Sequence, residues 1–92
     1  MRMQAVRDNP ARHRFELNVD GHVAVAVYER GEGVITFTHT EVPKELGGRG
    51  VGSALAKGAL DQVRSQGLKV VAKCPFIAGY IRKNAEYQDL LA

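Results

Sequence analysis

The run of glycines near the middle of the chain restricts the fold more than any other feature of the sequence. Four of the six residues from Gly47 to Gly52 are glycine, and they stand between a strand-like segment (34–42) and a helix-like segment (51–66). Glycine reaches positive φ and lets a ligand approach the backbone closely. Free N–H groups and the helix dipole make such a turn suited to a phosphate or pyrophosphate. The alternative, a tight turn without a ligand, needs fewer glycines.

Three segments before this loop have the pattern of β-strands. Residues 13–19 alternate between apolar and polar side chains, residues 22–30 are rich in valine, and residues 34–42 are dense in β-branched and aromatic residues. An Asp-Gly pair, a two-residue hairpin signal, joins the first two. These strands are expected to form an antiparallel meander. A further short strand is expected near residues 3–7.

The segments after the loop predict a crossover. Apolar residues in 51–66 recur at the i, i+3, i+4 spacing of a helix, and residues 68–73 form a short buried strand. A second helix is expected over 76–84, with a final turn at 87–91. The order β-β-β-α-β-α predicts an α/β fold in which the last two strands are parallel and connected right-handedly. Ligands of such sheets bind beyond the carboxyl ends of the strands, where the glycine loop lies.

Length and composition limit the possible functions. Ninety-two residues make one domain, 1–92, and a net charge of +3 on scattered residues does not indicate a nucleic-acid partner. No apolar run approaches the ~20 residues of a membrane helix, and the N-terminal segment lacks the apolar part of a signal peptide, so we expect a cytoplasmic protein with no membrane partner. The single cysteine and the histidine spacing predict no disulfide and no metal site. A monomer is compatible with this sequence.

Several short motifs occur together in one known family. They are His-Thr-Glu-Val-Pro at 39–43, the glycine loop, Cys-Pro-Phe at 74–76 followed by Tyr80, and Glu-Tyr at 86–87. Together they resemble a minimal, single-domain subfamily of the GNAT superfamily of N-acetyltransferases, over about residues 13–91.

The cofactor motif of the GNAT superfamily is Gln or Arg, two residues, Gly, any residue, and then Gly or Ala. Its second half is matched by Gly50-Val51-Gly52, whereas Gly47 stands where Gln or Arg is expected. This departure bears on side-chain contacts at the loop and leaves the backbone N–H groups available.

The resemblance implies a fold that keeps the acetyl-CoA half of a GNAT domain and lacks the N-terminal helices that usually build the acceptor site. The strand at 34–42 is then expected to diverge from the next parallel strand, so that its exposed backbone pairs with the pantetheine arm or takes part in ordinary ladder pairing. An N–H there would also stabilise the oxyanion of the thioester. The predicted cofactor-binding residues are Thr40, Val42, Leu46, Gly47, Gly48, Arg49, Gly50, Val51, Gly52, Phe76 and Lys83.

Four residues are candidates for catalysis. Tyr80 matches the tyrosine that protonates the leaving thiolate in many GNAT enzymes, or it is a helix tyrosine that packs on the sheet. Cys74 is a nucleophile that carries the acetyl group, lines the thioester pocket, or is a buried strand-end residue. His39 and Glu41 share one strand face, and either is a candidate base, with a structural histidine as the alternative. Three basic residues are phosphate contacts or solvated surface charges: Arg49, Arg82 and Lys83.

We therefore predict an acetyl-CoA-dependent N-acetyltransferase that acts on a lysine side chain, a polyamine or a small amine, directly or through acetyl-Cys74. The alternative is a non-catalytic acyl-CoA-binding or sensor module that acts with a partner. A weaker alternative is a phosphate-binding domain for another nucleotide, but no Gly-Lys-Ser/Thr ending follows the loop, so a P-loop is disfavoured.

Overall fold

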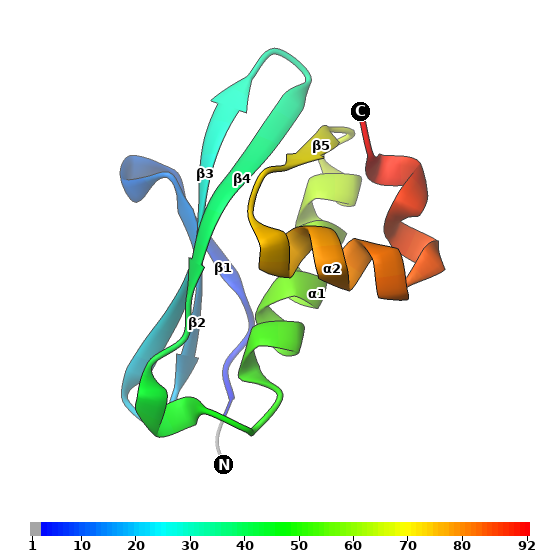
Figure 1. Ribbon diagram of the computed structural model, residues 1–92. Coiled ribbons are helices and arrows are strands. Elements are labelled where there is room, and N and C mark those ends of the chain that lie inside the picture. The colour runs from blue at the N-terminus through cyan, green and yellow to red at the C-terminus, as the bar shows by residue number, and fades with distance from the viewer. Residues whose placement is uncertain (1–2) are drawn as a thin grey trace.

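The structure, a computed structural model, describes residues 3–92 and is built on one mixed β-sheet (Figure 1). In the described chain the strands follow the order β1-β2-β3-β4-β5 across the sheet. They are β1 (Arg7–Asn9), β2 (Arg14–Val19), β3 (His22–Gly31), β4 (Val34–Glu41) and β5 (Lys69–Ala72). The helices are α1 (Val51–Ser65) and α2 (Pro75–Lys83), with short 3₁₀ helices η1 (Pro10–Arg12), η2 (Lys44–Leu46) and η3 (Ala85–Leu90).

The sheet confirms the predicted meander and crossover. Strands β1 to β4 pair antiparallel in sequence order, and α1 then carries the chain to β5, which pairs parallel with β4. The α/β class and the predicted order from the second strand onward are therefore correct. The two predicted helices are also present, and no boundary differs from the prediction by more than one residue.

The first short strand was predicted too early in the chain. It lies at Arg7–Asn9, where it pairs with β2, and it shares only Arg7 with the predicted segment 3–7, which also forms an isolated bridge between Met3 and Val19. Pro10 ends this strand and begins η1, because proline has no N–H for the ladder and its fixed φ suits the first turn of a helix.

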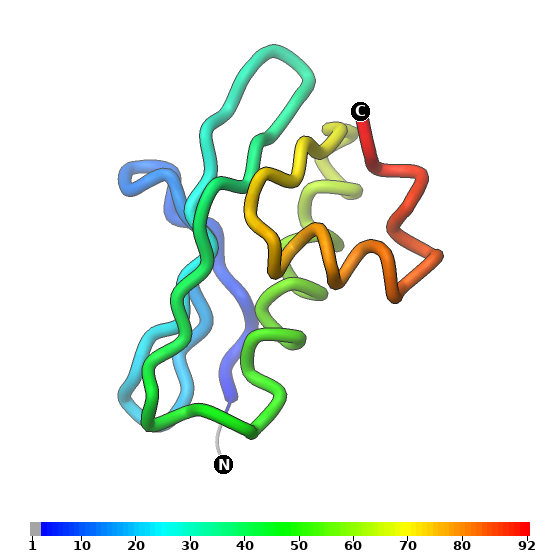
Figure 2. Tube along the Cα trace, in the orientation of Figure 1, coloured from blue at the N-terminus to red at the C-terminus, as the bar shows by residue number. Residues whose placement is uncertain are grey.

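Both α-helices lie on the same side of the sheet (Figures 1 and 2). The core forms between them and the sheet face that carries Phe15 and Phe37, and Leu55 and Leu60 of α1 are fully buried against it. No helix of the described chain covers the opposite face, where the side chain of Val23 remains 39% exposed. No helix in residues 3–92 has the length and apolar character that crossing a bilayer requires.

A β-bulge changes which side chains of β4 face the core. Tyr28 of β3 pairs with Phe37, but the next residue of β3, Val27, pairs with His39, so that Thr38 is an extra residue on β4. Beyond a bulge of this kind, each later side chain of the strand points to the opposite face of the sheet from the one it would otherwise occupy. Ile35 and Phe37 therefore point into the core, whereas the side chains after the bulge change faces.

Candidate functional site

The glycine loop forms a left-handed turn that leads directly into α1. Gly48 and Gly50 have φ of +75° and +71°, and Gly50 is the N-cap residue of α1. A Cβ at either position would meet nothing within 4 Å. Backbone conformation is therefore the reason for glycine at both positions, because L-residues with a side chain are strained at such φ values.

Two of the predicted loop amides already have acceptors inside the turn. The N–H of Leu46 donates to the Pro43 carbonyl at 2.9 Å, and that of Gly47 donates to the Lys44 carbonyl at 3.1 Å. The Leu46 side chain is also buried in the core. In α1 the first N–H that bonds back into the turn is that of Ala54, to the Gly50 carbonyl at 3.0 Å. The predicted anion site is thereby narrowed to the amides after Gly47, at the start of α1.

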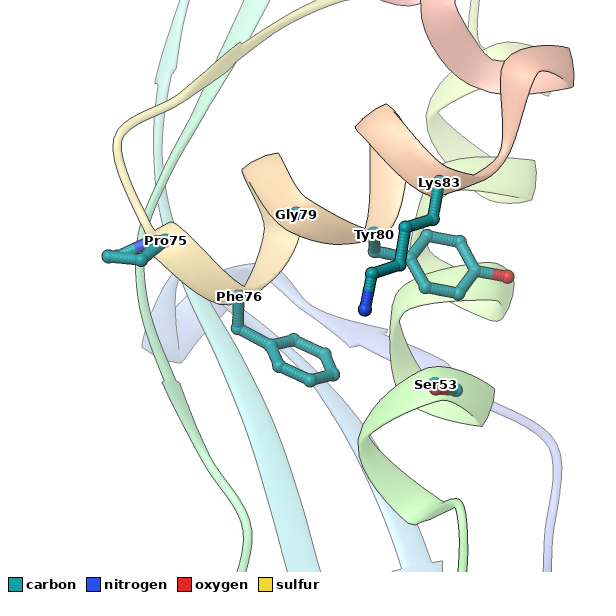
Figure 3. A pocket seen from close by; sticks show the side chains of 6 residues that line it. All are labelled: Ser53, Pro75, Phe76, Gly79, Tyr80 and Lys83. Carbon is teal, nitrogen blue, oxygen red and sulfur yellow. The ribbon is translucent and has the colours of Figure 1, made fainter.

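A pocket of about 260 Å³ lies between this first turn of α1 and the neighbouring helix α2 (Figure 3). In Figure 3 the side chains of Phe76 and Lys83 project into the space between the two helices. A Cβ on Gly52 would lie 2.8 Å from the tip of the Phe76 ring, so this glycine lets the ring pack against the helix start. The lining residues are Ser53, Pro75, Phe76, Gly79, Tyr80 and Lys83.

Three of these lining residues, Ser53, Pro75 and Gly79, were not among the predicted site residues. For Gly79 the available signal was helical spacing, because it follows Phe76 by three residues on the same face of α2. Arg82, by contrast, does not join this pocket, because it lines a separate cavity with residues of β5 and the C-terminal segment.

Strand β4 continues beyond the point where β5 leaves it. The last paired residues are Phe37 and Ala72, and the N–H groups of Lys73 and Cys74 then both donate to the Phe37 carbonyl at 3.0 Å. From residue 38 to Glu41, β4 pairs with β3 alone among the described strands. Its other backbone edge therefore lies open between Cys74 and the glycine loop.

Cys74 lies at the fork, which is the point where β4 and the segment that leads into α2 diverge. Its thiol is 3.1 Å from the hydroxyl oxygen of Thr40, and either group could donate that hydrogen bond. Cys74 is the N-cap residue of α2, and only 4% of it is exposed. The structure thus brings Thr40 and Cys74 together, a contact that their separation in sequence did not reveal.

His39 and Glu41 form a pair on the uncovered face of the sheet. His39 Nε2 lies 3.2 Å from Glu41 Oε2, and both side chains are more than half exposed. The bulge places them on this face, opposite to Thr40. Arg49, which the sequence offered as a phosphate contact, instead lies 3.5 Å from the carboxylate of Asp20 in the β2–β3 turn.

Tyr80 lines the pocket, but its hydroxyl does not point toward the start of α2. Figure 3 shows its ring projecting toward α1 and away from Pro75, and the ring packs against Tyr87 with a centroid distance of 5.9 Å. Burial is the main reason that the pKa of Tyr80 lies above its ordinary value. The group is therefore protonated at neutral pH, as a general acid must be.

Within residues 3–92, no group of three His, Cys, Asp or Glu side chains is arranged to hold a metal ion.

Comparison with known proteins gives one consistent result. The family model of GCN5-related N-acetyl-transferases matches residues 14–90. Protein NATD1 of Mus musculus is 37% identical over 82 residues, which cover 86% of this chain and 74% of that protein, and Protein NATD1 of Homo sapiens is 37% identical over 82 residues, covering 86% and 73%. The NMR solution structure of a GCN5-like protein from Staphylococcus aureus superimposes with a TM-score of 0.72 at 30% identity, and the match covers 95% of this chain and 86% of that one.

Proposed function

Because this chain belongs to the GCN5-related N-acetyltransferase family, we propose that it transfers the acetyl group of acetyl-CoA to an amine. The observation that carries this proposal is the open edge of β4 between Cys74 and the glycine loop. An extended pantetheine arm adds to such an edge through main-chain hydrogen bonds, as an extra strand does. At one end of that edge lies the thiol of Cys74, and at the other lie the amides at the start of α1.

In this arrangement the pyrophosphate of the coenzyme meets the amides between Gly48 and Gly52. The helix dipole of α1 and the free N–H groups of its first turn favour a negative charge there. Lys83, in the adjacent pocket, adds a positive charge on the α2 side, and the Phe76 ring offers an apolar wall. The thioester then reaches the fork that Thr40 and Cys74 form.

The reaction forms a C–N bond and breaks the C–S bond of the thioester. The amine approaches β4 from the uncovered face of the sheet and loses a proton to His39 or Glu41, whose paired side chains stand on that face. A backbone N–H of β4 stabilises the oxyanion, and Tyr80 protonates the departing thiolate after its side chain rotates toward the start of α2, from which its hydroxyl points away. In the direct route the amine attacks the thioester itself. In the covalent route the Cys74 sulfur bonds to the acetyl carbon as the C–S bond to CoA breaks, the CoA thiolate takes up the proton that the Cys74 thiol loses, and the amine then displaces the Cys74 thiolate.

Calorimetry with CoA tests whether the glycine loop binds the coenzyme. Gly50→Ala is the informative variant, because it strains the turn and displaces the amides of the loop. Gly67→Ala is its matched control: Gly67 follows α1, has φ of +71° and would likewise meet nothing within 4 Å. Both variants are expected to lose about 1–2 kcal/mol of stability, but only Gly50→Ala should bind CoA more weakly. Equal CoA affinities in the two variants would contradict the loop assignment.

Release of free CoA thiol, measured with acetyl-CoA and a panel of amines, tests whether the protein transfers the acetyl group. Turnover with at least one amine supports the proposal. The uncovered face of the sheet favours one alternative, a non-catalytic acyl-CoA-binding module that needs a partner to complete the acceptor site. CoA binding without thiol release, for every amine tested, would indicate that module. Preference for ATP or NAD over CoA in competition would instead indicate a different nucleotide.

A further inference from the structure

The uncovered face of the sheet carries a cavity that shares no residue with the pocket between α1 and α2. Its volume is about 430 Å³, which lies within the range of small-molecule sites. Its residues come from three neighbouring strands and the segment after β4: Arg14, Val23, Val25, Glu41, Val42 and Pro43.

The strand register sets the floor and the two walls of this cavity. Val25 pairs with Glu16 of β2 on one side and with Glu41 of β4 on the other. Arg14 stands two residues before Glu16 on β2, on the same face and opposite Val27. Since β2 and β4 both flank β3, their backbones are two strand spacings apart, roughly 10 Å. The valines of β3 form an apolar floor, with Arg14 on one wall and Glu41 on the other.

The Arg14 wall carries a net positive charge. Arg14 donates from Nε to Glu16 Oε2 at 2.7 Å, and Arg7 lies 3.8 Å from the other oxygen of the same carboxylate. The hydrogen bond from Arg14 is the main cause that lowers the pKa of Glu16, so this carboxylate is ionised at neutral pH. Two guanidinium groups therefore face one carboxylate. A guanidinium has five N–H donors, and the bond to Glu16 uses the one on Nε.

The opposite wall is acidic. The Glu41 side chain is 70% exposed, and its Oε2 lies 3.2 Å from His39 Nε2. A carboxylate at one wall, a guanidinium at the other and two valines between them complement a molecule with an ammonium group, a short apolar chain and a carboxylate.

We infer that this cavity binds the acceptor, and that the acceptor is an amino-acid-like amine whose carboxylate is held by Arg14 and whose ammonium group is held by Glu41. The connecting carbons lie on Val23 and Val25. The assignment of this ligand as the acceptor rests on the proposed acetyl transfer, and the amine then lies beside the His39–Glu41 pair that takes its proton. Recognition of the carboxylate is a property of the cavity itself and is measurable without acetyl-CoA.

A titration followed by NMR, with the methyl signals of Val23 and Val25 as the readout, tests the inference with 5-aminopentanoate as the probe. The matched ligands are pentylamine, which lacks the carboxylate, and pentanoate, which lacks the amine. We expect 5-aminopentanoate to bind at least about tenfold more tightly than either and to shift these valine methyls.

Arg14→Gln and Glu41→Gln should each weaken binding of 5-aminopentanoate about tenfold. Arg12→Gln is the control, because Arg12 is an exposed arginine of η1 outside the cavity, and its affinity should equal that of the unmodified protein. If Arg14→Gln fails to fold because Glu16 loses its partner, Glu41→Gln still decides the matter, since Glu41 is exposed and its loss leaves the core intact.

Equal affinity for 5-aminopentanoate and pentylamine would overturn the inference, as would binding that leaves the Val23 and Val25 methyls unshifted. A turnover assay with the same two amines separates this result from the proposed function. Acetylation of pentylamine as fast as 5-aminopentanoate overturns the inference and upholds acetyl transfer. Absence of thiol release with every amine refutes acetyl transfer, and the acceptor role with it, while the titration still decides whether the cavity recognises the carboxylate.

Discussion

Gly58→Ala is expected to destabilise the protein although it places a better helix former inside α1. The N-terminal segment crosses this helix at Gly58, where an added Cβ would lie 2.6 Å from the Cβ of Val6 and would also collide with its Cγ2 methyl. One turn later, Gln62 donates from Nε2 to the Val6 carbonyl at 2.7 Å. Val6 is thus fixed both at its side chain and at its backbone, and it cannot withdraw without losing this hydrogen bond.

The expected magnitude follows from opposing contributions. Alanine is favoured over glycine inside a helix by about 1 kcal/mol. Forcing a methyl group into a packed contact costs about 1–3 kcal/mol, and a broken Gln62–Val6 hydrogen bond costs about 1 kcal/mol more. The net loss is therefore about 1–3 kcal/mol, which lowers Tm by about 4–24 °C in a domain of this size.

Thermal unfolding followed by far-UV circular dichroism measures this effect, with Gly79→Ala as the matched control. Gly79 is also inside a helix, but a Cβ there would lie 3.7 Å from an Arg82 Nη2 atom, which is an ordinary contact. Gly79→Ala should therefore raise stability by up to about 1 kcal/mol. Adding Val6→Ala to Gly58→Ala should recover part of the loss. If Gly58→Ala proves as stable as Gly79→Ala, the reasoning is wrong.

Two further predictions concern the thiol and the C-terminal segment. Cys74 is buried and hydrogen-bonded to Thr40. Direct transfer therefore predicts that the Cys74→Ala variant still binds CoA and turns over within about tenfold of the unmodified protein. Abolished turnover with intact CoA binding would indicate the covalent route. Tyr87→Phe should cost about 1 kcal/mol at pH 7 in urea unfolding, because the Tyr87 hydroxyl donates to Asp61 at 2.7 Å, a carboxylate that is 49% exposed. That hydrogen bond is the main cause that lowers the pKa of Asp61, so its contribution is complete above the unfolded pKa of about 3.9 and is lost as pH falls through the lower folded-state value. A Tyr87→Phe deficit that stays constant down to about pH 2 would contradict this linkage.

Much of the fold could be predicted because it is encoded over short distances in the chain. Alternation in residues 13–19, the Asp20-Gly21 turn and the glycines before α1 each set local backbone preferences that the structure keeps. The glycine loop could be recognised without tertiary information, because glycine readily reaches the left-handed φ that Gly48 and Gly50 adopt. The short first strand was misplaced because three residues give too little pattern to fix a boundary.

The sequence by itself determined the order of the elements from β2 onward and the glycine turn, since these follow from period and turn chemistry. Only the tertiary structure decided which face each group occupies. The bulge at Thr38 turns His39 and Glu41 away from Cys74, and packing against Tyr87 directs the Tyr80 ring toward α1. These outcomes depend on how strands pair and how helices pack, and a single extra residue in a ladder moves every later side chain of that strand to the other face.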